Sequence, residues 1–245
     1  MKKGVLFILS CVLLWNCSEG GMDCFQKQGE IITEEISVEF FDKISIATGI
    51  ELVVKEAEEQ EVKIEAGKNL IGDIEVKVEN GELKIRNNNG CEMLRNYHPA
   101  TIYVSTPVLE KIYSSSQYSV RSDGVLTFPE LSLESGIIAD TPLTIFEMEI
   151  QNQKITINDN ISSVFKIRGS TEYLGVYFWG SNGRLEAENL TAQEVGVYHR
   201  STNDMIVFPV QKVSGTIAST GNLVLKNLPP IVEVEQLYTG HVVYP

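Results

Sequence analysis

The chain contains little histidine, cysteine or positive charge. Its 245 residues include three His and four Cys, which leaves few side chains for a metal or redox centre, so we expect no metal ion and no cofactor. Twenty Lys and Arg stand against 33 Asp and Glu, for a net charge of −13. This excess of acid argues against nucleic acid, or an anionic lipid surface bound by charge alone, as the partner. With 43% hydrophobic and 22% charged residues, the chain is neither disordered nor a membrane bundle.

The chain also lacks a hydrophobic run long enough to span a bilayer as a helix. The uncharged run Gly4–Trp15 follows two lysines and is typical of the hydrophobic region of a signal peptide. Leu14-Trp15-Asn16-Cys17 then resembles the processing site of a bacterial lipoprotein, with Cys17 as the lipidated first residue of the mature chain. A site at Cys11 and a plain secretory signal are the alternatives.

We therefore expect a lipoprotein signal peptide over residues 1–16 and a small, polar tether over 17–35. Acyl chains on Cys17 would hold the protein in the cell envelope, as an outer-membrane lipoprotein that is periplasmic or surface-exposed. Beyond the tether, Cys24 and Cys91 are candidates for a disulfide, which would contribute about 4 kcal/mol by restricting the unfolded chain. Two unpaired thiols are the alternative.

Residues 36–104 show the alternation of apolar and charged residues that is typical of half-buried β-strands. The clearest segments are residues 44–46, 51–55, 61–65, 74–78 and 82–86. Asn80-Gly81, between the last two, predicts a two-residue hairpin turn. No stretch of a dozen residues has a convincing helical period. We expect an N-terminal β region over 36–104 with almost no helix.

From residue 105 onward, short apolar segments recur about every 20 residues. Their anchors are Leu109, Leu131, Leu174, Val195, Val213 and Val234, with Lys154–Ile157 as a less distinct copy. Because such a repeat without helices cannot bury its own apolar row, we expect an all-β fold. The specific prediction is a right-handed parallel β-helix, or β-solenoid, over 105–245. A β-sandwich with unequal loops is the alternative.

Two copies of the repeat are nearly identical: residues 174–178 read LGVYF and residues 195–199 read VGVYH. Strand alternation directs Leu174, Val176 and Phe178 inward, beside Val195, Val197 and His199. Tyr177 and Trp179 point outward, and Tyr177 is expected beside Tyr198. Tyr177, Trp179 and Tyr198 are therefore a candidate binding strip for sugar rings or for the apolar edge of a partner protein. The alternative is that these rings only support the coils.

Several segments resemble one protein family. They are Phe41-Asp42-Lys43-Ile44 with Gly49-Ile50, Val78-Glu79-Asn80-Gly81-Glu82-Leu83, and the closing Tyr238–Tyr244. Together with the lipoprotein signal, they look like the putative auto-transporter adhesin, head GIN domain family of Gram-negative envelope lipoproteins. The resemblance covers about Phe40 to Pro245. It implies a parallel β-helix-like fold, export and no established enzymatic activity, although a fold alone does not carry a function.

The competing function is that of a carbohydrate-active enzyme, a polysaccharide lyase or a glycosidase on a β-helix. Such an enzyme needs paired carboxylates, or an acidic cluster that holds Ca²⁺ beside a base. The chain instead has single turn aspartates and scattered histidines: Asp123, Asp140, Asp159 and Asp204, with only Asp140 and Asp159 about one coil apart, and His98, His199 and His241. We therefore expect no catalytic residue and a non-enzymatic role in adhesion, scaffolding or ligand binding.

A solenoid has two open ends with unpaired backbone groups. We expect the N-terminal hairpin region to cap one end and Val242-Val243-Tyr244 to close the other. Poor capping would allow homo-oligomers that form end to end. The expected partners are thus the membrane through the lipid anchor, a glycan or protein ligand, and a second copy of the chain, but no nucleic acid.

Overall fold

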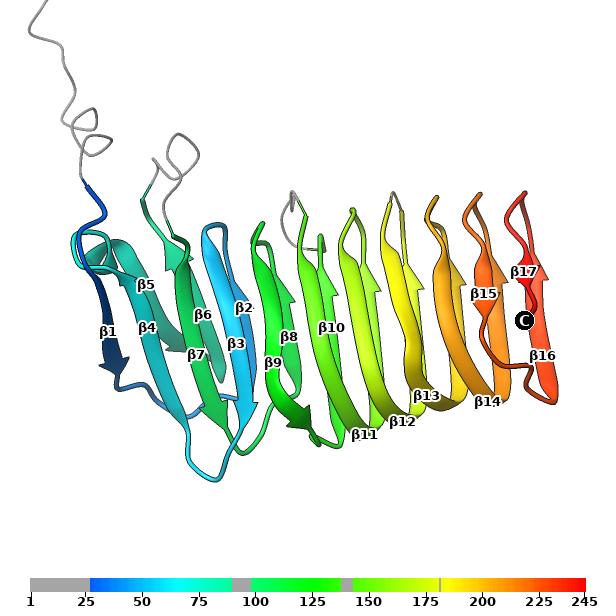
Figure 1. The fold of residues 1–245 in the computed structure, drawn as a ribbon, viewed down its shortest axis with the longest axis horizontal. Helices are drawn as coiled ribbons and strands as arrows, with labels where there is room; N and C mark the ends of the chain where they lie inside the picture. Colours follow the sequence, from blue (N-terminus) through cyan, green and yellow to red (C-terminus); the bar gives the residue numbers. More distant parts are fainter. Residues whose placement is uncertain (1–26, 90–97, 138–142, 181) are drawn as a thin grey trace, which may run out of the picture.

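The chain folds into stacked β-coils, seen side-on in Figure 1. The computed structural model describes residues 27–89, 98–137, 143–180 and 182–245. In chain order the strands are β1 (Ile31–Ile36), β2 (Lys43–Ile46), β3 (Ile50–Glu56), β4 (Glu61–Gly67), β5 (Ile74–Glu79), β6 (Glu82–Asn87), β7 (Ala100–Thr106), β8 (Lys111–Ser114), β9 (Ser119–Leu126), β10 (Glu130–Ser135), β11 (Ile145–Asp159), β12 (Val164–Phe178), β13 (Arg184–His199), β14 (Met205–Ile217), β15 (Leu223–Leu225), β16 (Ile231–Gln236) and β17 (Val242–Val243). Within the described residues, the only helical element is the 3-10 turn η3 (Ile71–Asp73), as the absence of a helical period predicts.

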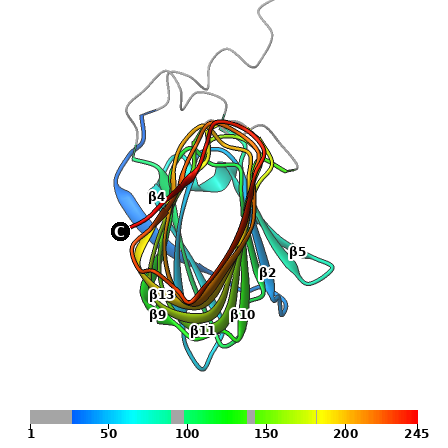
Figure 2. The ribbon, with the colours of Figure 1, turned by 90° about the vertical axis from the view of Figure 1, so that its right-hand side faces the viewer.

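The coils form a flattened tube with two long faces, which Figure 2 shows along its axis. Face 1 has the strand order β1-β4-β7-β3-β9, then the first halves of β11 to β14, then β15 and β17. Face 2 has the order β5-β6-β2-β8-β10, then the second halves of β11 to β14, then β16. All pairs from β2 to the C-terminal end are parallel except β5–β6 and β4–β7. The predicted parallel β-solenoid is confirmed, and the β-sandwich alternative is wrong.

The strand register confirms most of the predicted repeat. Leu131, Ile155, Leu174, Val195 and Val213 pair in succession and form one inward column. The last anchor is wrong by two residues, because Val213 pairs with Val232 and Val234 pairs with Gly215. Alternation fixes the face of a residue but does not detect a slip of two, since Val232 and Val234 point the same way. Leu109 also lies outside the column, because β8 begins only at Lys111.

The order of the first coils in space differs from their order in the chain. The coil formed by β2 and β3 lies between the β6–β7 coil and the β8–β9 coil. Parallel stacking therefore includes strands before residue 105. β1 begins at Ile31, inside the segment expected to be a tether, because the β-branched Ile31, Ile32 and Thr33 pair with β4 in an antiparallel ladder.

At the N-terminal end of the tube, antiparallel strands break the parallel pattern. β4 and β1 extend face 1 beyond β7, and the β5–β6 hairpin ends face 2. The hairpin turns at Asn80 and Gly81, whose φ angles of 54° and 75° are those of the predicted two-residue turn. The hairpin region thus lies at this end of the tube, and its expected role as a cap stays a prediction.

The inward side chains fill the tube. Ile44, Leu52, Phe146 and Phe165 are among those with no exposed surface. The rings of Phe146 and Phe165 stack on neighbouring coils with centroids 4.8 Å apart and planes 9° from parallel. Each coil thus buries its apolar row against the next one, and this burial makes the outer surface of both faces a rigid support for side chains.

Candidate functional site

The predicted aromatic strip lies on the outer side of face 2, where β12 and β13 end. Tyr177 pairs directly with Tyr198, and Trp179 follows the last residue of β12. The ring centroid of Trp179 lies 6.2 Å from that of Tyr177 and 5.0 Å from that of Tyr198. Trp179 is 48% exposed, while both tyrosines are half-buried. The structure therefore brings the three predicted residues together; we call Tyr177, Trp179 and Tyr198 the aromatic strip.

Tyr173 supports the strip, although it is not part of the near-identical repeats. A Cβ placed on Gly175 would lie 3.1 Å from ring atoms of both Tyr173 and Tyr177, and one on Gly196 would lie 2.2 Å from the Tyr173 hydroxyl. The rings thus cover the two glycines of the near-identical repeats. Burial raises the pKa of Tyr173 to about 12, and the Tyr177 hydroxyl adds to the shift. The available signal was strand alternation, which places Tyr173 on the same outward side as Gly175 and Tyr177.

Two polar side chains stand on either side of Trp179 along the tube. The backbone N–H of Trp179 donates to the carbonyl of Asp159, and that of Arg200 donates to the carbonyl of Phe178, both at 2.9 Å. Asn160, Trp179 and Arg200 therefore occupy equivalent positions on three successive coils. Asn160 and Arg200 are both exposed. Along the tube, Trp179 thus has an exposed residue with an amide side chain on one neighbouring coil and an exposed residue with a guanidinium side chain on the other.

Two polar side chains near the strip, His199 and Asp159, face inward and are closed to a ligand. His199 is fully buried, and its Nδ1 accepts a hydrogen bond from the backbone N–H of Ser201 at 3.4 Å. Burial lowers the pKa of His199, so the imidazole stays neutral. Asp159 is also fully buried, and burial raises its pKa to about 7, with only a partial offset from Ser163. Both side chains lie at turns where they face the core.

The other residues considered for catalysis do not come together among the described residues. Asp123 is on β9 of face 1, whereas Asp204 precedes β14 and accepts from Asn222. His98 and His241 are exposed near opposite ends of the tube. Within the described ranges, no three His, Cys, Asp or Glu side chains are grouped so that they could hold a metal ion. Cys17, Cys24, Cys91 and Asp140 lie outside the described residues.

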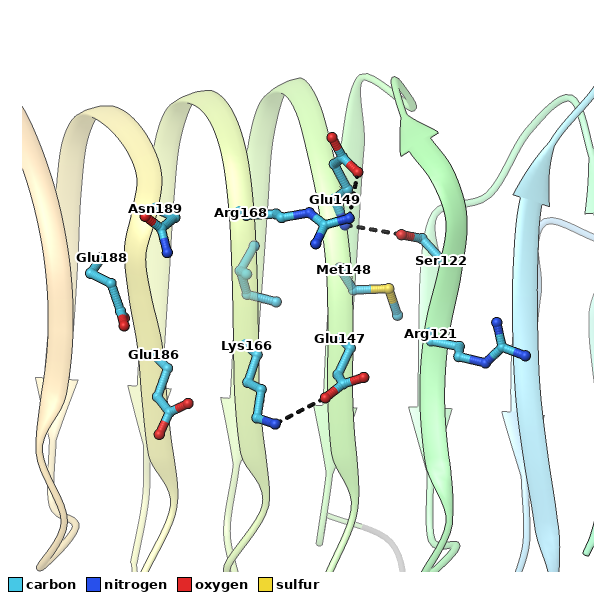
Figure 3. A pocket seen from close by; sticks show the side chains of 11 residues that line it. Arg121, Ser122, Glu147, Met148, Glu149, Lys166, Arg168, Glu186, Glu188 and Asn189 are labelled. Atoms are coloured by element: carbon cyan, nitrogen blue, oxygen red, sulfur yellow. Dashed lines mark hydrogen bonds and ion pairs between the residues drawn. The ribbon is translucent and has the colours of Figure 1, made fainter.

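A second surface feature, not predicted from the sequence, is a charged groove of about 400 Å³ on the outer side of face 1. Figure 3 shows Lys166 facing Glu147, and Arg168 facing Glu149, across neighbouring coils; their ion pairs measure 2.9 and 2.8 Å. Register shifts between paired strands occur at the same level and redirect side chains. Lys166 and Arg168 already have carboxylate partners. We therefore interpret the side chains that line the groove as a ladder of ion pairs between coils, which favours the observed register. Exposed pairs of this kind contribute only about 0–1 kcal/mol each.

No helix in the part of the chain that the structure describes is long and apolar enough to cross a membrane. Comparison with known proteins gives a family and a set of similar structures. The family model described as putative auto-transporter adhesin, head GIN domain, matches residues 40–229. No curated protein sequence matches the chain.

Several solved structures have the same fold. A putative adhesin from Bacteroides fragilis NCTC 9343 is 18% identical, with a TM-score of 0.78, and the match covers 88% of this chain and 97% of that one. A putative lipid binding protein from Parabacteroides distasonis ATCC 8503 is 14% identical, with a TM-score of 0.63 and the same coverage. A putative adhesin from Parabacteroides merdae ATCC 43184 is 13% identical, with a TM-score of 0.59 over 88% of this chain and 97% of that one. At these identities the likeness shows the fold.

Proposed function

Because the chain belongs to the putative auto-transporter adhesin, head GIN domain family, we propose that it is a non-enzymatic adhesin of the cell envelope that binds its ligand on the aromatic strip. The observation that carries this proposal is the 48% exposure of Trp179 between two tyrosines, on a fully packed scaffold. Large exposed aromatic side chains on a rigid surface are typical of binding sites for sugars and proteins. The scaffold lowers the entropy cost of binding because it holds the rings in place before the ligand arrives.

The anchor belongs to the same proposal. Lipid on Cys17 would attach the chain at the N-terminal end of the tube, where β1 is the outermost strand of face 1. Six strand spacings separate β1 from β12 along that face, which is about 30 Å at roughly 4.8 Å each. An anchored molecule could therefore present the aromatic strip away from the membrane. Protease accessibility on intact cells, with C17A as the comparison, tests the anchor and separates surface exposure from a periplasmic position.

Ligand binding is tested with immobilised glycans and with cell-surface or matrix proteins. We expect W179A to lose binding that the parent chain shows, with an unchanged circular dichroism spectrum. F40A is the control, since Phe40 is 64% exposed but precedes β2, which lies four strand positions from β12 on face 2. Equal binding by W179A and the parent would remove the strip from consideration. One structural neighbour is called a putative lipid binding protein, so phospholipid vesicles belong in the same assay; binding to vesicles alone would contradict the proposal.

A further inference from the structure

Resting on the proposed function, we infer that the aromatic strip takes an acidic saccharide, with the sugar ring on Trp179 and its acidic group on Arg200. The inference comes from the position of Arg200 and from the charges around it. Arg200 follows His199, which pairs with Phe178, and so it stands beside Trp179 on the next coil. One coil corresponds to about 4.8 Å along the tube, so one ligand can contact both residues.

Arg200 differs from most cations of the solenoid in its surroundings. Arg121, Arg168 and Arg184 each have a carboxylate within 3.5 Å or less. On face 2, Lys154 pairs with Glu130 at 3.0 Å and Lys212 pairs with Glu233 at 2.6 Å. Arg200 is exposed and has no ion-pair partner among the described residues. In a chain with a net charge of −13, an unpaired guanidinium beside an aromatic surface is a local site for an anion.

The groups around Trp179 define the class of ligand. An indole face packs against the apolar C–H face of a sugar ring, while a guanidinium binds a carboxylate or sulfate with two parallel hydrogen bonds. On the opposite side of Trp179, the exposed amide of Asn160 offers both a donor and an acceptor for hydroxyl groups. A neutral glycan would form no ion pair with Arg200. A purely apolar protein edge would form neither an ion pair with Arg200 nor a hydrogen bond with Asn160.

The test uses a panel of acidic oligosaccharides, namely oligogalacturonate, alginate and hyaluronan fragments, each compared with its carboxyl-reduced neutral form. We expect the parent chain to bind at least one acidic form more tightly than its neutral form. R200Q should weaken that binding about 10- to 100-fold and leave binding of the neutral form unchanged. R200K should restore part of the affinity. R168Q, on face 1, is the matched control and should bind like the parent.

The outcomes separate this inference from the proposed function. If no acidic form binds the parent more tightly than its neutral form, the acidic ligand class is wrong. Saccharide binding that is lost in W179A but is indifferent to Arg200 would leave the strip in place and overturn only the role of Arg200. Acid-dependent binding that survives in W179A would instead contradict the strip itself.

Discussion

Tyr173 and Gly196 lie on neighbouring coils, so close that a Cβ on Gly196 would approach the Tyr173 hydroxyl oxygen to 2.2 Å. The missing side chain of Gly196 makes room for the ring, which in turn lies against Tyr177 and supports the aromatic strip. The glycine of the repeat is therefore part of the site, because it decides where the aromatic side chains lie.

We expect Gly196→Ala to displace the Tyr173 ring, lower the free energy of unfolding by about 1–2 kcal/mol and weaken ligand binding. Urea unfolding and a binding titration measure the two effects. Gly72→Ala is the control, because no atom lies within 4 Å of a Cβ at that position. Unchanged stability and affinity in G196A would show that the Tyr173 contact does not support the strip.

Stacking of the coils predicts a disulfide that alternative folds would not allow. Tyr177→Cys and Tyr198→Cys together place two thiols at directly paired positions, which suits the Cα separation of a disulfide. Non-reducing peptide mapping should find the cross-link after mild oxidation. The pair Tyr177→Cys and Thr216→Cys spans two coils and should remain unlinked. Cross-linking of the second pair but not the first would contradict the register.

The stacked phenylalanines predict a large loss of stability on truncation. Phe165→Ala removes a fully buried ring that stacks on Phe146, and we expect it to lower the free energy of unfolding by about 3–5 kcal/mol. Leu143→Ala, at an exposed position, should change it by less than about 0.5 kcal/mol. Chemical denaturation followed by circular dichroism compares the two. A loss in F165A as small as that in L143A would mean that the ring is not part of a packed core.

The raised pKa of Asp159 predicts that the free energy of unfolding decreases as pH rises. Its folded-state pKa of about 7 lies above the ordinary value of 3.8, so between these values the folded chain keeps a proton that the unfolded chain has released. Stability therefore falls as pH rises through this window. Asp159→Asn should remove that part of the pH dependence and be more stable than the parent at pH about 8.

The lowered pKa of His199 has the opposite effect on how stability depends on pH. Because burial lowers its pKa, stability is lost as pH falls below the ordinary value of 6.5. Thermal unfolding of the parent and D159N across pH isolates the carboxyl group, since both chains keep His199. Parallel pH profiles for the two chains would show that Asp159 ionises normally in the folded state.

The sequence predicted the part of the fold that depends on local periodicity. Alternation and the two near-identical repeats placed Tyr177 beside Tyr198 and directed Phe178 and His199 inward. It did not predict that β2 and β3 insert between later strands, because that order depends on long connections rather than on side-chain pattern. Val232 and Val234 lie on the same side of the strand by alternation. The sequence therefore could not decide which of them pairs with Val213 in the last coil.

The candidate site was predicted only in its central residues. Strand alternation predicts that Trp179, Tyr177 and Tyr198 point outward. It does not predict which residues of the adjacent coils lie beside Trp179. Asn160 and Arg200 become its neighbours through the coil register, and Tyr173 becomes part of the site because its ring reaches over Gly196. These are relations between coils, and a single strand pattern does not contain them.

The most direct measurement uses Trp179 as the reporter of binding. The chain has two tryptophans, Trp15 and Trp179, so Trp15→Phe leaves the strip with the sole indole fluorophore. When a ligand identified with the immobilised glycans or proteins is titrated into W15F, we predict a blue shift of the Trp179 emission and reduced quenching by acrylamide. The affinity is measured by calorimetry. Calorimetric binding without any change in the emission or quenching of Trp179 would place the ligand elsewhere and contradict the aromatic strip as the binding surface.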